Sequence, residues 1–119
     1  MRQTEKAREL LVGQPTVDTR DSLGTTPLMQ CAEMGELQLM QWLIDHLADV
    51  NARDRFGQTP LMYAAGSNQL TAARLLLRYG ANPALQAKTG QTAFDIAVVR
   101  EGDTVADMLR EEPGVIARK

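Results

Sequence analysis

Apolar side chains return every three or four residues in a stretch of the chain that begins at residue 26. Leu28, Cys31 and Ala32 fall on one face of a helix at this spacing. Thr26 stands just before this face and can cap the helix. Pro27 suits the first helical position, because its missing N–H costs nothing there. The pattern therefore predicts a short helix that runs to about residue 34.

A second stretch with a broad apolar face follows at residues 37–45. Leu39, Met40, Trp42 and Leu43 form this face, and polar side chains cover the other side. Gly35 separates the two stretches, and the segment A-D-V-N-A-R at residues 48–53 leads away from them. The chain is thus predicted to form a pair of helices joined by a tight turn and followed by an extended segment.

The same unit recurs at a fixed interval. The motif G-T-T-P-L begins at Gly24, G-Q-T-P-L begins at Gly57, and a weaker copy, G-Q-T-A-F, begins at Gly90, so the spacing is 33 residues. A fixed period of roughly 20–50 residues is typical of stacked repeats. We therefore predict helices after residue 59, at residues 70–79, near residues 92–100 and at residues 103–111.

The first 20 residues match only the second half of a unit, with a short helix predicted at residues 4–12. Leu10 and Leu11 lie one period before Leu43 and Ile44. Either the array is cut from a longer protein or a minimal cap begins here. The predicted boundaries, all within one domain, are an N-terminal half repeat at 1–20, repeats at 21–53 and 54–86, a capping repeat at 87–114 and a tail at 115–119.

Four segments carry a resemblance to a known family. They are G-T-T-P-L-M-Q-C-A from Gly24, G-Q-T-P-L-M-Y-A-A from Gly57, A-D-V-N-A-R-D from Ala48 and L-L-L-R-Y-G-A-N-P from Leu75. With these motifs, and with a 33-residue unit of helix, tight turn, helix and extended segment, the chain resembles the ankyrin repeat. The resemblance implies an all-α solenoid of three repeats plus an N-terminal half repeat, with stacked helix-turn-helix pairs and β-hairpin fingers. It also implies non-catalytic protein binding on the concave surface formed by the fingers and first helices.

The sequence departs from the family pattern at two kinds of position. The family usually has His after T-P-L, where this chain has Met29, Met62 and Asp95. Hydrogen bonding at the start of these helices is therefore expected to be absent or different. Leu47 stands where the next repeat has Gly80, at a position that requires a positive φ angle. We expect the loop at Leu47 to be rearranged.

Composition and charge narrow the class of function. The 119 residues carry a formal net charge of −2, which gives no global attraction to nucleic acid or to an anionic membrane. No apolar run approaches the roughly 18–20 residues needed to span a bilayer, and the N-terminal residues lack the pattern of a signal peptide. Cys31 is the only cysteine, so no intrachain disulfide is possible. These features favour an intracellular protein, cytoplasmic or nuclear.

No set of residues in the sequence points to catalysis, a metal or a cofactor. His46 is the single histidine and is expected to be exposed, since one histidine makes no metal site. Cys31 aligns with Ala64 and Ala97, so we expect a packed thiol and no nucleophile. Trp42 is expected to pack in the core. We therefore predict that the protein is no enzyme and takes no cofactor.

Alignment of the repeats by their period separates positions that recur from positions that vary. Recurring positions serve the fold, and varying positions are free to carry specificity. Six columns vary on the fingers and first helices: Ser22/Arg55/Lys88, Leu23/Phe56/Thr89, Thr25/Gln58/Gln91, Gln30/Tyr63/Ile96, Glu33/Gly66/Val99 and Met34/Ser67/Arg100.

Apolar and basic side chains on the fingers are the main candidates for partner binding. Leu23 and Phe56 are apolar at finger tips, where water favours polar residues, and aromatic and arginine side chains are enriched as anchors of interfaces. The basic side chains along the fingers favour an acidic partner segment with apolar anchors. The predicted partner-binding residues are Leu23, Met34, Arg53, Arg55, Phe56, Tyr63 and Lys88.

Two functions from different classes follow from this sequence. The favoured one is a protein–protein interaction module within a larger intracellular regulatory or scaffold protein, acting as a monomer. The alternative is a structural segment that docks within a larger chain or self-associates through its uncovered N-terminal end. Nucleic acid ranks third as a partner, because the basic row is short and the aromatic residues are few. No membrane partner is expected.

Overall fold

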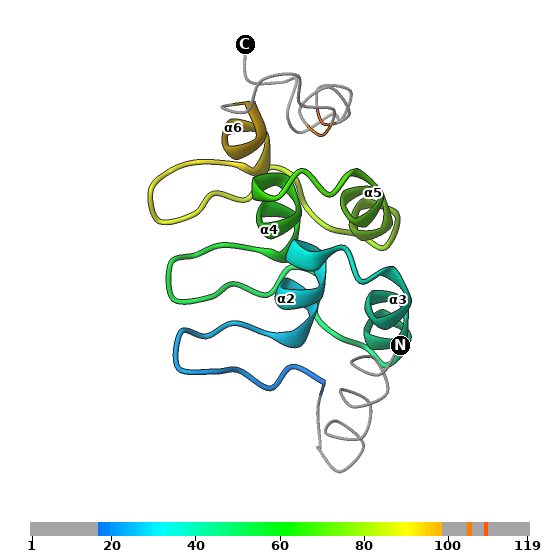
Figure 1. Ribbon diagram of the computed structural model, residues 1–119. Coiled ribbons are helices and arrows are strands. Elements are labelled where there is room, and N and C mark those ends of the chain that lie inside the picture. The colour runs from blue at the N-terminus through cyan, green and yellow to red at the C-terminus, as the bar shows by residue number, and fades with distance from the viewer. Residues whose placement is uncertain (1–16, 99–104, 106–108, 110–119) are drawn as a thin grey trace.

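Two rows of short helices and a set of projecting loops make up the computed structural model, which describes residues 17–98, 105 and 109. Figure 1 shows α2, α4 and α6 stacked in one row and α3 and α5 in a second row, with finger-like loops on the opposite side. The helices are α2 (Pro27–Met34), α3 (Leu37–Asp45), α4 (Pro60–Gly66), α5 (Leu70–Arg78) and α6 (Ala93–Val98). In the first row α4 packs against both α2 and α6. The helix pairs predicted from the 33-residue period are therefore confirmed within the described residues.

Threonine side chains cap the helices of the first row, as predicted. The Thr26 hydroxyl accepts a hydrogen bond from the Met29 backbone N–H at 3.3 Å, and Thr59 caps α4 in the same way. The different bonding expected after T-P-L is found at two sites. The Met29 sulfur accepts from the Thr26 N–H at 3.4 Å, and in the third repeat the Asp95 carboxylate accepts from the Thr92 N–H at 3.0 Å. A side chain three residues into the helix thus still closes the cap without histidine.

The loop at Leu47 is not rearranged, so that prediction was wrong. Leu47 has a φ of 71° and takes the left-handed conformation that Gly80 takes in the next repeat. In both loops the following N–H bonds back to the helix at 2.9 Å, from Ala48 to Leu43 and from Ala81 to Leu76. The Leu47 side chain is 87% exposed and clashes with nothing in the core. The cap bonds therefore outweigh a left-handed penalty of about 1 kcal/mol.

The core lies between the two rows of helices and is built from leucine, methionine and alanine. Met40, Leu43, Leu61 and Leu76 are fully buried within it. Cys31 is 6% exposed and packs in the core as expected. The small alanine side chains let neighbouring helices approach closely, which suits a fold whose repeats touch only their neighbours.

Trp42 lies at the edge of the core, as a half-buried side chain packed against the buried cluster. Its ring stacks on the ring of His46 with centroids 4.0 Å apart, and His46 is exposed as predicted. The tryptophan therefore packs against the core with one part of its side chain and stacks on the exposed histidine with its ring.

Hairpin-shaped fingers are present, but no β-strand occurs among residues 17–98. The second finger holds two backbone hydrogen bonds, from Asp54 N–H to the Gln58 carbonyl and from Gly57 N–H to the Asp54 carbonyl, each of 3.0 Å. One backbone–backbone hydrogen bond per period joins neighbouring fingers, such as Lys88 N–H to the Phe56 carbonyl at 2.9 Å. These few backbone hydrogen bonds are enough for a tight turn, but they do not form the repeated pattern of bonds that defines a β-strand.

Several predictions fall partly or wholly outside the described residues. These include the helix at residues 4–12, the uncovered N-terminal end and the tail at 115–119. Of the helix predicted at residues 103–111, the structure describes Val105 and Leu109, which are helical and fully buried. No helix in the described part of the chain is long and apolar enough to cross a membrane.

Candidate functional site

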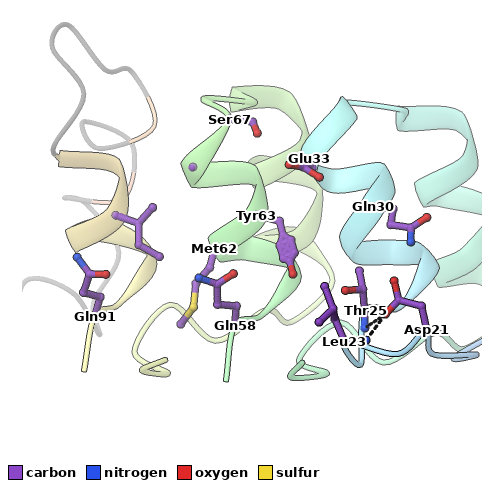
Figure 2. A pocket seen from close by; sticks show the side chains of 12 residues that line it. Asp21, Leu23, Thr25, Gln30, Glu33, Gln58, Met62, Tyr63, Ser67 and Gln91 are labelled. Carbon is purple, nitrogen blue, oxygen red and sulfur yellow. Dashed lines mark hydrogen bonds between the residues drawn. The ribbon is translucent and has the colours of Figure 1, made fainter. Parts of the chain in front are cut away.

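A groove of about 640 Å³ lies between the fingers and the first row of helices. Figure 2 shows side chains from all three successive repeats facing this groove. Its lining consists of Asp21, Leu23, Thr25, Gln30, Glu33, Gln58, Met62, Tyr63, Gly66, Ser67, Gln91 and Ile96. The lining thus mixes amides, hydroxyls and apolar groups with two carboxylates.

Arginine side chains fix the spacing of the fingers that form one wall of the groove. Arg20 donates to the Arg53 carbonyl at 2.7 Å, and Arg53 in turn donates to the Gln86 carbonyl. Arg55 donates in the opposite direction, to the Ser22 carbonyl at 3.0 Å. Because each of these bonds joins one repeat to the next, the arginines hold the fingers side by side.

A buried aspartate fastens the second finger to α4. One carboxylate oxygen of Asp54 accepts from the backbone N–H groups of Phe56 and Gln58, both at 2.9 Å. The other oxygen accepts from the Tyr63 hydroxyl. Burial and this hydrogen bond raise the pKa of Tyr63 to about 12. The phenol is therefore neutral near pH 7 and its ring is held in a fixed place in the groove.

The equivalent aspartate in the first finger lacks such a tyrosine. Asp21 accepts from the N–H groups of Leu23 at 2.9 Å and Thr25 at 2.8 Å, but its counterpart of Tyr63 is Gln30. The backbone N–H of Thr25 is the main cause that lowers the pKa of Asp21. Asp21 is exposed, so its negative charge faces water and the groove.

Gly66, the last residue of α4, contributes to the groove wall without a side chain. Gly66 occupies the column that holds Glu33 in the first repeat. Among the described residues, a Cβ atom at Gly66 would meet only the Ile96 Cγ2 atom, at the ordinary contact distance of 3.7 Å. The described neighbours of Gly66 therefore leave room for a side chain at this position.

The residues predicted to bind a partner lie in two settings. Leu23 and Tyr63 line the groove, and Leu23 is 49% exposed. The other five are exposed but do not line it: Met34 at the end of α2, and Arg53, Arg55, Phe56 and Lys88 on the fingers. The structure thus separates an exposed finger edge, formed by Arg53, Arg55, Phe56 and Lys88, from the groove itself.

Most of the lining was not named as partner-binding from the sequence, although a signal for it was present. Every lining residue except Asp21 and Met62 belongs to one of the six varying columns. The selection within those columns favoured apolar and basic side chains and so passed over Glu33 and the glutamines. Asp21 lies outside the varying columns because aspartate recurs one period later, as Asp54.

The described residues hold no group of three or more His, Cys, Asp or Glu side chains that could bind a metal ion. Burial, helped by the nearby Glu36 carboxylate, raises the pKa of the Cys31 thiol to about 12. A thiol with that pKa is a poor nucleophile near pH 7.

Comparison with family models gives one match, to the model described as "Ankyrin repeats (3 copies)". It covers residues 2–87 and, in an overlapping match, residues 47–117. Among curated proteins no relative matches the chain.

Proposed function

Because the chain belongs to the ankyrin-repeat family, we propose that it binds a segment of another protein in the groove between its fingers and first helices. Ankyrin repeats are generally protein–protein interaction modules, and the family is typically non-catalytic and intracellular. The chain would serve this role within a larger regulatory or scaffold protein. The observation that carries the proposal is a groove of about 640 Å³ that crosses three repeats.

Apolar groups give the groove its anchor points. Leu23 is 49% exposed at one end, and Tyr63 and Ile96 line the central and far parts as half-buried side chains. Covering apolar surface of this kind contributes about 25 cal/mol per Å² of area removed from water, before the cost of ordering the partner. Amides of Gln30, Gln58 and Gln91 supply hydrogen-bond donors and acceptors beside these anchors.

The finger edge supplies a second contact area. Phe56 is 56% exposed there, and Arg55 and Lys88 place positive charge beside it. A partner segment that continues from the groove over this edge would gain from acidic side chains at that point, as the sequence predicts. Charge at the edge of an interface mainly changes the association rate and its salt dependence.

The test is a substitution, Gly66→Gln, which places a side chain in the groove, followed by measurement of peptide affinity. Peptides that bind the immobilised chain are selected from a displayed random library, and their affinity is then measured against Gly66→Gln. The new side chain occupies the place that Glu33 takes in the first repeat, so we expect at least about tenfold weaker binding.

Gly66→Ala is the matched control, because it adds only a methyl group and favours the helix. It should leave the affinity of the selected peptides nearly unchanged. Binding that is equally strong to the wild-type chain and to Gly66→Gln would overturn the proposal.

A further inference from the structure

We propose that the groove selects a partner segment that carries a lysine or arginine next to an apolar side chain. This inference rests on the proposed function and specifies the chemistry of the segment. It goes beyond the acidic preference expected at the finger edge, because the charge inside the groove has the opposite sign.

Among the described residues, the groove is lined by two carboxylates and by no basic side chain. Asp21 and Glu33 supply the carboxylates, and the described lining includes no Lys, Arg or His. Both side chains are exposed. Asp21 is kept ionised by the backbone N–H groups of its own turn, so its charge is available near pH 7.

The cations of the fingers do not neutralise this charge from within the groove. Arg55 donates to the Ser22 carbonyl, and Arg20 donates to the carbonyls of Gly24 and Arg53. Neither arginine lines the groove. The Glu33 carboxylate has no hydrogen bond or ion pair with the described residues. A cation supplied by a partner therefore has a carboxylate ready to receive it.

Tyr63 gives such a side chain an apolar surface on which to lie. Figure 2 shows Tyr63 on α4 facing the groove, with Glu33 and Gln30 on the neighbouring α2. Glu33 and Tyr63 both line the groove, from neighbouring helices. Lysine and arginine bury their methylene stems along apolar surface and keep their charged ends at polar groups, and cations favour aromatic faces.

The apolar neighbour of the cation has its own place at Leu23. This side chain stands at the end of the groove that also holds Asp21, and half of it is exposed. A short extended segment can therefore place one apolar side chain on Leu23 and one basic side chain over Tyr63.

The test uses the peptides selected from the displayed library. Peptides that lose affinity for Gly66→Gln are expected to be enriched in Lys or Arg beside an apolar residue. Their binding should weaken about threefold for Glu33→Gln and about tenfold for Glu33→Lys. Raising the salt from about 50 mM to about 500 mM should weaken binding as well.

Asp45→Asn on α3 is the matched control, because it removes one exposed carboxylate that does not line the groove. It should leave the affinity unchanged. The inference is overturned if groove-bound peptides show no enrichment in basic residues, or if Glu33→Lys binds them as tightly as the wild-type chain. In either case sensitivity to Gly66→Gln would still support the groove as the binding site, so the two failures are distinguishable.

Discussion

In both the first and the second repeat, an aspartate at the start of the finger's turn accepts two backbone N–H groups, at 2.8 to 2.9 Å. Only in the second repeat does a tyrosine from the helix donate to that aspartate as well. Asp54 is consequently buried at 6% exposure, whereas Asp21 is exposed. In both repeats one carboxylate oxygen of the aspartate accepts the hydrogen bonds of the turn. The other oxygen binds the Tyr63 hydroxyl in the second repeat, whereas in the first repeat its negative charge faces the groove.

Gly57 lies where two neighbouring fingers leave no room for a side chain, and its substitution gives the largest expected effect. A Cβ atom at Gly57 would lie 2.9 Å from the Lys88 backbone nitrogen, and Gly57 has a φ of 77°. Gly57→Ala should therefore lower the free energy of unfolding by about 2 kcal/mol or more, through both the clash and the backbone strain. Unfolding in urea, followed by circular dichroism, measures this change.

Gly90 provides the control for the clash. It has a φ of 90°, but a Cβ atom there would meet no described atom within 4 Å. Gly90→Ala should cost only the backbone term, about 1 kcal/mol. Equal losses for the two variants would show that the approach of the next finger contributes nothing.

Tyr63→Phe removes the hydrogen bond from the Tyr63 hydroxyl to Asp54 that joins the second finger to α4. It leaves the buried Asp54 oxygen without its donor, so we expect a loss of about 1–2 kcal/mol in the free energy of unfolding. Gln30→Ala is the matched change in the first repeat, where no helix side chain bonds to Asp21, and it should stay within about 0.5 kcal/mol of the wild-type value. A larger effect at Gln30 than at Tyr63 would contradict the difference between the two repeats.

Leu47 and Gly80 differ in residue type at the same left-handed position, and this difference predicts a gain in stability. Leu47→Gly should raise the free energy of unfolding by about 1 kcal/mol, because glycine adopts a φ of 71° without steric cost. Gly80→Ala should produce a loss of similar size. If Leu47→Gly destabilises the chain instead, the exposed leucine makes a stabilising contact.

The titration of Tyr63 has the smallest expected effect on folding stability near pH 7, but absorbance of the phenolate measures it directly. Its pKa is raised to about 12, so the neutral phenol is favoured in the folded chain. The stability from this shift is fully present below the ordinary tyrosine pKa of about 10 and is lost as the pH rises through about 12. In a Tyr79→Phe variant, phenolate absorbance reports Tyr63 alone. A titration midpoint near pH 10 for Tyr63 in the folded chain would contradict the hydrogen bond between Tyr63 and Asp54.

Most of the scaffold was predictable because local chemistry decides it. The T-P-L motif specifies a capped helix, the glycines specify turns, and the period fixes how the units stack. The bounds of α3 were predicted at residues 37–45 and are found at Leu37–Asp45. The error at Leu47 arose because residue preference alone was weighed, whereas two backbone bonds held the loop in place.

The sequence by itself determined the repeat, its register and the six columns in which the groove residues occur. Only the tertiary structure decided which of those residues meet. Arg53 and Arg55 were predicted to bind a partner, and in the structure their guanidinium groups bind carbonyls of neighbouring fingers, one period away. Glu33, Tyr63 and Gly66 come together because stacking places successive repeats side by side. Contacts of this kind depend on the packing of one repeat against the next, which no single repeat encodes.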